Sequence, residues 1–195
     1  SCTGNPPTQR GYDAAMELFA KLEGLEGKDL CSAVQAVYDD HRSRLSALLN
    51  LPEGTEVVLC PSGSDAEYIP IAIARALKGD DVHITNGITQ LSEIGAGSAP
   101  AAVGKYFSTH VPLVGRLSGE REVLSGFENL GGITVSARDD EGNVVDAATE
   151  MDNFAEEAFA RGAYPIIHGV FGGKTGLRDS KMAPSLEGGD KSLSV

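Results

Sequence analysis

Apolar residues recur at intervals of three and four along three stretches of the chain. The first stretch runs from Tyr12 to Leu22, and the second from Asp29, a predicted helix cap, to about Leu49. The third runs from Ala147 to Arg161 and is followed by Gly162, a residue that commonly ends helices. Because this spacing places apolar side chains on one face of a helix, it predicts three amphipathic helices.

Short apolar runs, bounded by turn residues, occupy much of the remaining chain. They predict buried strands at residues 56–60, 81–85, 133–136 and 164–170. A helix is expected from Ser64 or Asp65 to about Leu77, with a kink near Pro70. Residues 90–107 are expected to form a loop with an interrupted helix, and residues 139–143 a turn.

The order of these elements indicates the fold class. Strands that alternate with helices favour an α/β fold with a mainly parallel sheet and helices on both faces. Residues 1–50 are expected to form an N-terminal arm and helices, in which the polar stretch 1–11 is the extended arm. Residues 51–195 are expected to form the α/β domain.

Composition and charge narrow the classes of partner. The 28 acidic and 16 basic residues give a net charge of −12, which disfavours binding to a nucleic-acid backbone. The sequence contains no apolar run long enough to span a membrane. Its three cysteines lack the paired spacing of a zinc site, so we expect no metal site and unpaired thiols. This favours a reducing intracellular location, either the cytoplasm or the interior of a plastid or mitochondrion.

The segment from Cys60 to Glu67, CPSGSDAE, is the strongest candidate for chemistry. It lies between a predicted strand and a predicted helix, where free N–H groups and the helix dipole favour an anion. Gly63 would allow a close approach of the backbone, and Ser62 and Ser64 would add hydroxyl donors. The segment therefore predicts a phosphate-binding turn, although a plain turn with a good helix cap explains the same residues.

The block from Leu51 to Leu77, LPEGTEVVLCPSGSDAEYIPIAIARAL, resembles the cofactor-phosphate region of fold-type I pyridoxal-phosphate enzymes, the aspartate-aminotransferase superfamily. The resemblance extends as an ordered pattern over roughly residues 25–195 and implies a partial large domain of that fold. It implies pyridoxal phosphate as cofactor, with Ser62, Gly63 and Ser64 holding the phosphate. Asn86 and His168, at the ends of predicted strands, are weaker candidates for contacts with the cofactor.

The resemblance also implies two residues that this chain is not expected to contain. Enzymes of the family pair an aspartate with the pyridine nitrogen and attach the cofactor to a later lysine. Residues 192–195 look like the start of the strand that would carry the aspartate, so no catalytic residue is expected here. Lys174 could act as a nucleophile if it were buried, but an exposed loop charge or a contact with a substrate carboxylate is favoured.

Other polar residues are weaker candidates for the same site. Glu93 and Asn86 follow the second predicted strand and could line the crevice, or they could be ordinary surface residues. His83 is expected to be a core or sheet-end histidine. The remaining lysines considered are Lys105, Lys181 and Lys191.

Two hypotheses about function follow. The first is the N-terminal part of a pyridoxal-phosphate-dependent transferase or lyase of amino-acid-like substrates, inactive as this chain alone. The second is a non-catalytic structural or accessory subunit that retains part of the fold. In both cases the open edge of the sheet favours a partner, either another protein chain or a second copy of this one.

Overall fold

The computed structural model describes residues 6–111, 115–117, 122–136, 138–145, 147–170, 172–179 and 193–194. The chain divides into two compact units, residues 1–60 and 61–195. The sequence predicted a boundary after residue 50, whereas the structure divides the chain after residue 60. Segment 51–60 therefore belongs with the N-terminal helices rather than with the α/β unit.

The first unit contains two helices, α1 (Gln9–Leu22) and α2 (Gly27–Leu49). Helix α1 begins earlier than predicted because the Thr8 side chain caps it, accepting a hydrogen bond from the Gly11 N–H at 3.1 Å. The expected arm is correspondingly shorter, and residues 1–5 lie outside the described part of the chain. Neither helix contains a buried residue.

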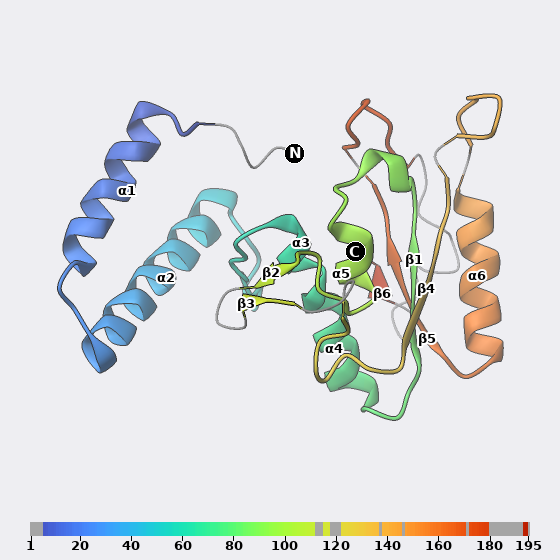
Figure 1. Cartoon of the computed structure of the whole chain (residues 1–195), viewed down its shortest axis with the longest axis horizontal. Helices are drawn as coiled ribbons and strands as arrows, with labels where there is room; N and C mark the ends of the chain where they lie inside the picture. The colour runs from blue at the N-terminus through green and yellow to red at the C-terminus, as the bar shows by residue number, and fades with distance from the viewer. Residues whose placement is uncertain are drawn as a thin grey trace. The chain divides into compact units, whose positions relative to one another are not determined.

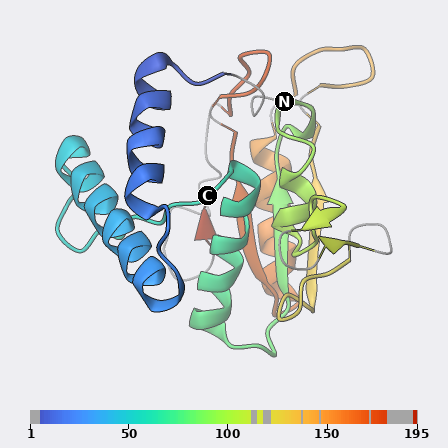
Figure 2. The same ribbon diagram turned by 60° about the vertical axis from the view of Figure 1, so that its left-hand side comes forward.

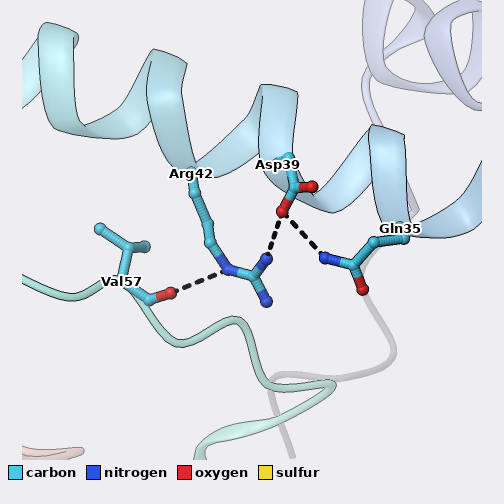
Figure 3. Close-up of polar contacts among 4 residues, drawn as sticks. All are labelled: Gln35, Asp39, Arg42 and Val57. Atoms are coloured by element: carbon cyan, nitrogen blue, oxygen red, sulfur yellow. Dashed lines mark hydrogen bonds and ion pairs between the residues drawn. The ribbon is translucent and has the colours of Figure 1, made fainter.

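The predicted strand at residues 56–60 is wrong. This segment is not a strand, and the Val58 side chain is 58% exposed. The Val57 carbonyl accepts a hydrogen bond from Arg42 Nε at 3.2 Å, and Arg42 is held by Asp39 at 2.9 Å (Figure 3). An apolar run forms a strand only where a neighbouring strand pairs with it, and here a helix side chain binds the backbone instead.

The second unit is built on a parallel sheet of four strands (Figure 1). Its strands lie in the order β4 (Leu130–Thr134), β1 (Ile84–Ile88), β5 (Tyr164–His168) and β6 (Leu193–Ser194). The parallel α/β fold is therefore confirmed, although β1 and β4 are each shifted by about three residues from the predicted runs. Strand β6 lies within residues 192–195, where the sequence predicted the start of a final strand. Residues 192 and 195 lie outside the described part of the chain.

Among the described residues, the helical segments that accompany the sheet are α3 (Gly63–Ala66), α4 (Tyr68–Lys78), the 3-10 turn η2 (Leu91–Glu93), α5 (Ser98–Ala102) and α6 (Ala148–Ala160). A short antiparallel pair, β2 (His110–Val111) and β3 (Gly115–Arg116), lies apart from the main sheet. The helix predicted from residue 64 to 77 is interrupted at Glu67. Pro70 lies in the first turn of α4, where a missing N–H breaks no helical hydrogen bond.

Helices cover both faces of the sheet, as the sequence predicted (Figures 1 and 2). On one face, Met151 and Phe154 of α6 pack in a cluster with Ile167. On the other face, Ile71 of α4 packs in a cluster with Ile166. The neighbours Ile166 and Ile167 point to opposite faces because side chains alternate along a strand.

None of the helices in the described part of the chain has the length and apolar character needed to cross a membrane. Cys31 and Cys60 are both free thiols, and Cys2 lies outside the described residues.

Candidate functional site

The order of the strands places a crevice between β1 and β5. After β1 the chain adds β4 on one side, and it then crosses over to add β5 on the other side. Ligands of open parallel sheets bind at such a reversal, outside the carboxyl ends of the strands. His168 is the last residue of β5 and lies at this position. Asn86, which the sequence placed after the end of its strand, is instead the middle residue of β1.

Asn86 and His168 form one buried polar chain with Glu67. Asn86 is fully buried and His168 is 7% exposed. His168 Nε2 lies 2.9 Å from Asn86 Oδ1, and His168 Nδ1 lies 2.9 Å from Glu67 Oε2. The second contact has ion-pair distance without straight hydrogen-bond alignment, and neither of its two atoms has another hydrogen-bond partner among the described residues. Buried polar atoms with unmet hydrogen-bonding capacity often mark a functional position.

A small cavity of about 50 Å³ lies beside Glu67 and His168, two members of this chain of polar contacts. Most of its lining is apolar, and its polar side chains are those of Glu67, His168 and Ser98. The cavity is too small for an aromatic ring, but it can hold a water molecule or one polar group, since a water needs only ~10–15 Å³ of such space.

The predicted phosphate-binding turn begins at Ser62, which caps α3. The Ser62 hydroxyl accepts from the Asp65 N–H at 3.2 Å and donates to Asp65 Oδ2 at 2.6 Å. The sequence expected Ser64 or Asp65 to be the cap. The Ser64 hydroxyl lies against Gly97, where an added Cβ would come within 2.7 Å of it. A Cβ added at Gly63 would meet no atom within 4 Å, so open space adjoins the turn there.

The turn is connected to the crevice through its neighbours. Ser64 lies beside Gly97, and the next residue, Ser98, lines the cavity. At the other end of α3, Glu67 contacts His168. The three predicted phosphate residues and the two weaker candidates therefore belong to one region of the second unit.

Glu93 is buried at the rim of this region and holds a loop in place. Its carboxylate accepts the Thr175 N–H at 2.7 Å and the Thr175 hydroxyl at 2.8 Å. These hydrogen bonds hold the pKa of Glu93 below its ordinary value, because they stabilise the charged form. The Glu93 carbonyl also accepts from the Lys174 N–H at 3.1 Å.

Asp179 fixes the far end of the same loop. Its carboxylate accepts from the Val170 N–H at 2.7 Å and from the Thr89 hydroxyl at 2.5 Å. It also accepts a hydrogen bond from Gln90, whose backbone has a left-handed conformation with φ near 50°. The loop from Gly172 to Asp179 is thus attached at both ends to the segment that follows β1.

The remaining candidates lie away from the polar chain. Lys174 is exposed in this loop and Lys105 is exposed beyond α5. His83 precedes β1, is exposed, and bonds through Nδ1 to Asn129 Oδ1 at 2.9 Å, so it is not a core residue. Lys181 and Lys191 lie outside the described residues.

Sequence reasoning missed Glu67, Thr175 and Asp179. Glu67 meets His168 across 101 positions of the chain, a pairing that no local pattern encodes. The position of Asp179 in the sequence was a weak indication of its role. An acidic residue at the end of a glycine-rich loop is suited to accept hydrogen bonds from the free N–H groups of that loop.

Tyr68, next to Glu67, adjoins the site and is neutral. Its hydroxyl donates to the Lys105 carbonyl at 2.8 Å, and its ring packs edge-on against Phe127. Burial, followed by the nearby Asp65 carboxylate, raises the pKa of Tyr68 to about 12. The phenol therefore acts here as a hydrogen-bond donor.

The described residues contain no group of three or more His, Cys, Asp or Glu side chains that could hold a metal ion. Comparison of the chain with protein-family models, with curated proteins and with solved structures finds no match.

Proposed function

We propose that this chain supplies the phosphate-binding part of a pyridoxal-phosphate-dependent transferase or lyase that acts on amino-acid-like substrates. The observation that carries the proposal is the junction of the Ser62–Ser64 turn with the crevice between β1 and β5. The turn reaches the cavity through Ser98 on one side and Glu67 on the other. This is where a parallel α/β sheet binds its ligands.

The residues present fit the phosphate of such a cofactor. The first N–H groups of a helix have no partner within the helix, so the N–H groups of Gly63 and Ser64 can donate to an anion. The Ser62 hydroxyl is already bonded to Asp65, which leaves the backbone as the main source of donors. Asn86 is fully buried and the cavity beside His168 is too small for an aromatic ring, so the fit concerns the phosphate alone.

The candidate lysines that the structure describes do not fit a covalent attachment of the cofactor. Lys174 and Lys105, the two candidate lysines that the structure describes, are both exposed and belong to loops outside the polar chain. Pyridoxal phosphate, when bound, supplies an electron sink for reactions at an amino-acid carbon. On this proposal the chain supplies phosphate binding, and the covalent anchor comes from other residues.

Titration of the purified chain with pyridoxal phosphate, and separately with pyridoxal, tests the proposal. We expect pyridoxal phosphate to bind more tightly, and we expect no adduct on a lysine after borohydride reduction, measured by intact mass. Gly63→Pro removes one N–H donor at the first helical position, where proline is tolerated and Ser62 already has the extended backbone that proline requires. It should weaken phosphate binding by roughly tenfold or more.

Ser62→Ala is the matched control. It removes the cap and costs about 0.5–2 kcal/mol of stability, but it keeps the N–H of Gly63. Equal affinity for the two compounds, or a Gly63→Pro variant that binds as well as the original chain, would contradict the proposal. Either result would favour the non-catalytic subunit hypothesis.

A further inference from the structure

Strand β4 lies at one edge of the parallel sheet. It pairs with β1 on one side, and no other strand of the described residues pairs with it. The Val135 N–H, just after the strand, donates to the Ile88 carbonyl of β1 at 2.8 Å. Because successive residues of a strand direct their backbone groups to alternate sides, those of Gly131 and Ile133 also face β1. The backbone groups that face the free edge belong to Leu130, Gly132 and Thr134.

This edge lacks the features that keep edge strands from pairing with other chains. Natural edge strands are protected by charged side chains, proline, bulges or a covering element. The sequence of β4 is LGGIT, without charge or proline, and its register with β1 has no bulge. Gly132, Ile133 and Thr134 are exposed, and the outward backbone groups have no hydrogen-bond partner among the described residues. Such groups are suited to bind another extended backbone.

A second copy of the chain presents an edge that complements this one. In an antiparallel pair centred on Gly132, the middle residue of β4, Gly132 faces its own counterpart and Leu130 faces Thr134 of the second copy. Each outward residue then exchanges both of its backbone hydrogen bonds with the residue opposite. No side chain separates the two strands at the centre, because both residues there are glycines. This register pairs the whole of β4.

The side chains around this register also fit a second copy. Ile133 of the second copy comes opposite Gly131, where an added Cβ would lie 3.0 Å from His83 Nε2. Ile133 can therefore pack against the His83 ring, a contact of the kind that stabilises neighbouring strands. Beyond the strand, the register brings the exposed Glu128 toward the exposed Arg138 of the second copy. The two-fold symmetry repeats this attraction of opposite charges at the other end.

We propose that two copies of this chain associate through their β4 strands, which pair antiparallel about a two-fold axis at Gly132 and form one continuous sheet. The same surface is used on both copies, so the contact closes with two chains and leaves no free β4 edge for a third. The β4 edge is separate from the crevice between β1 and β5, so the pairing does not depend on the proposed cofactor.

Sedimentation equilibrium of the full chain at a series of concentrations measures its mass, and amide hydrogen exchange followed by NMR locates the contact. We expect reversible association from the mass of one chain to that of two. The amides of Gly132 and Thr134 should exchange slowly in the dimer and faster on dilution. The amide of Ile133, which faces β1, should stay protected in both states.

Thr134→Pro is the decisive variant, because it removes an N–H that faces the free edge and breaks no hydrogen bond to β1. Proline is tolerated at such an edge position, and the extended backbone of Ile133 suits the residue before a proline. The variant should dimerise more weakly by roughly tenfold or more, since each copy loses a donor. Thr134→Val is the matched control, since it keeps the N–H and should dimerise like the original chain.

Ile133→Lys is a second variant that keeps every backbone donor. It places a charge on the edge, which is a device by which natural edge strands avoid pairing, so it should be monomeric. Thermal melting followed by circular dichroism shows whether each variant is folded. If Thr134→Pro does not fold, the comparison of Ile133→Lys with Thr134→Val decides the question.

A chain that stays monomeric at every concentration would overturn the proposal. A dimer whose Gly132 amide exchanges quickly, or that forms equally well in the folded variants Thr134→Pro and Ile133→Lys, would overturn it too. A monomer that binds an extended peptide at this edge would assign the edge to a different protein, and so would contradict pairing with a second copy. None of these measurements involves pyridoxal phosphate, so failure of the pairing and failure of cofactor binding can be distinguished.

Discussion

At the scale of single residues, the carboxylates Glu93 and Glu67 differ in how completely their oxygens are hydrogen-bonded. Glu93 accepts two hydrogen bonds from Thr175, and these bonds stabilise its charged form. Glu67 faces a ring nitrogen and a cavity, and its Oε2 is not aligned with a donor. A fully bonded carboxylate stabilises structure, whereas one with a poorly aligned partner keeps hydrogen-bonding capacity that is not met.

Glu93 should make stability depend on acid pH. Because its folded pKa lies below the ordinary value of 4.5, its contribution is fully present above that value. The contribution is lost as the pH falls through the lower folded pKa. We therefore expect Glu93→Gln to be less stable than the original chain near neutral pH, with the difference shrinking in acid.

Urea unfolding of both proteins at a series of pH values measures this effect. Thr175→Val removes the hydroxyl donor but keeps the backbone N–H, so it should lose part of the pH-dependent difference. A gap between the original chain and Glu93→Gln that stays constant down to acid pH would show that the two hydrogen bonds do not favour the charged form.

At the scale of elements, Arg75 connects α4 with the two segments that precede β1 and β4. Its guanidinium donates to the carbonyls of Asp80 and Val82, before β1. It also donates to the carbonyls of Glu128 and Asn129, before β4. The sequence could place Arg75 in a helix by spacing, but it could not show which carbonyls, up to 54 positions away, this side chain would reach.

Arg75→Ala should therefore destabilise the α/β unit. Several carbonyls would lose a charged donor, and we expect a loss of about 1.5–3 kcal/mol, the usual range for a hydrogen bond to a charged group. Arg75→Lys should recover only part of this loss, because an ammonium lacks the planar fork that serves several acceptors at once. Denaturant unfolding of the three proteins gives the comparison. Full recovery by lysine would mean that charge, rather than geometry, makes the connection.

The elements that could be predicted are those whose signal lies within their own residues. Helix α6 shows the three- and four-residue spacing, and its end at Gly162 has the left-handed backbone that glycine adopts readily. Segment 56–60 has the same apolar character as β5, yet β5 has strands on both sides and segment 56–60 does not. Pairing depends on distant residues, so composition alone could not separate the two.

At the scale of the whole molecule, the site could be predicted only in part. His168 was located because the carboxyl ends of parallel strands meet at one edge of a sheet, whereas Asn86 was predicted after its strand and lies in the middle of it. Their partner Glu67 was not, since its approach depends on where α3 ends and α4 begins. A sequence therefore indicates which strand ends form the crevice more readily than it indicates which side chains meet there.

The first unit presents the clearest question at this scale, because none of its residues from 6 to 60 is buried. Helices α1 and α2 have 14 and 23 residues, and neither buries a residue. Tyr12, Met16 and Phe19 of α1 are 52%, 46% and 57% exposed. The ion pair between Arg42 and Asp39 is itself largely exposed, so it contributes at most about 1 kcal/mol.

A fragment of residues 6–60 should therefore not fold cooperatively by itself. Helix α1, with 14 residues, falls in the range of ~12–15 residues below which isolated helices are marginal in water. Helix α2 is longer, but most helical stability comes from packing an apolar face, and α2 buries none. We expect partial helicity by circular dichroism, declining gradually on heating, while the full chain shows a sharp transition. Trifluoroethanol should raise the helicity of the fragment, which would show that its helices form once water competes less for the backbone. A sharp, two-state melt of the fragment would instead mean that the two helices stabilise each other without any buried side chain.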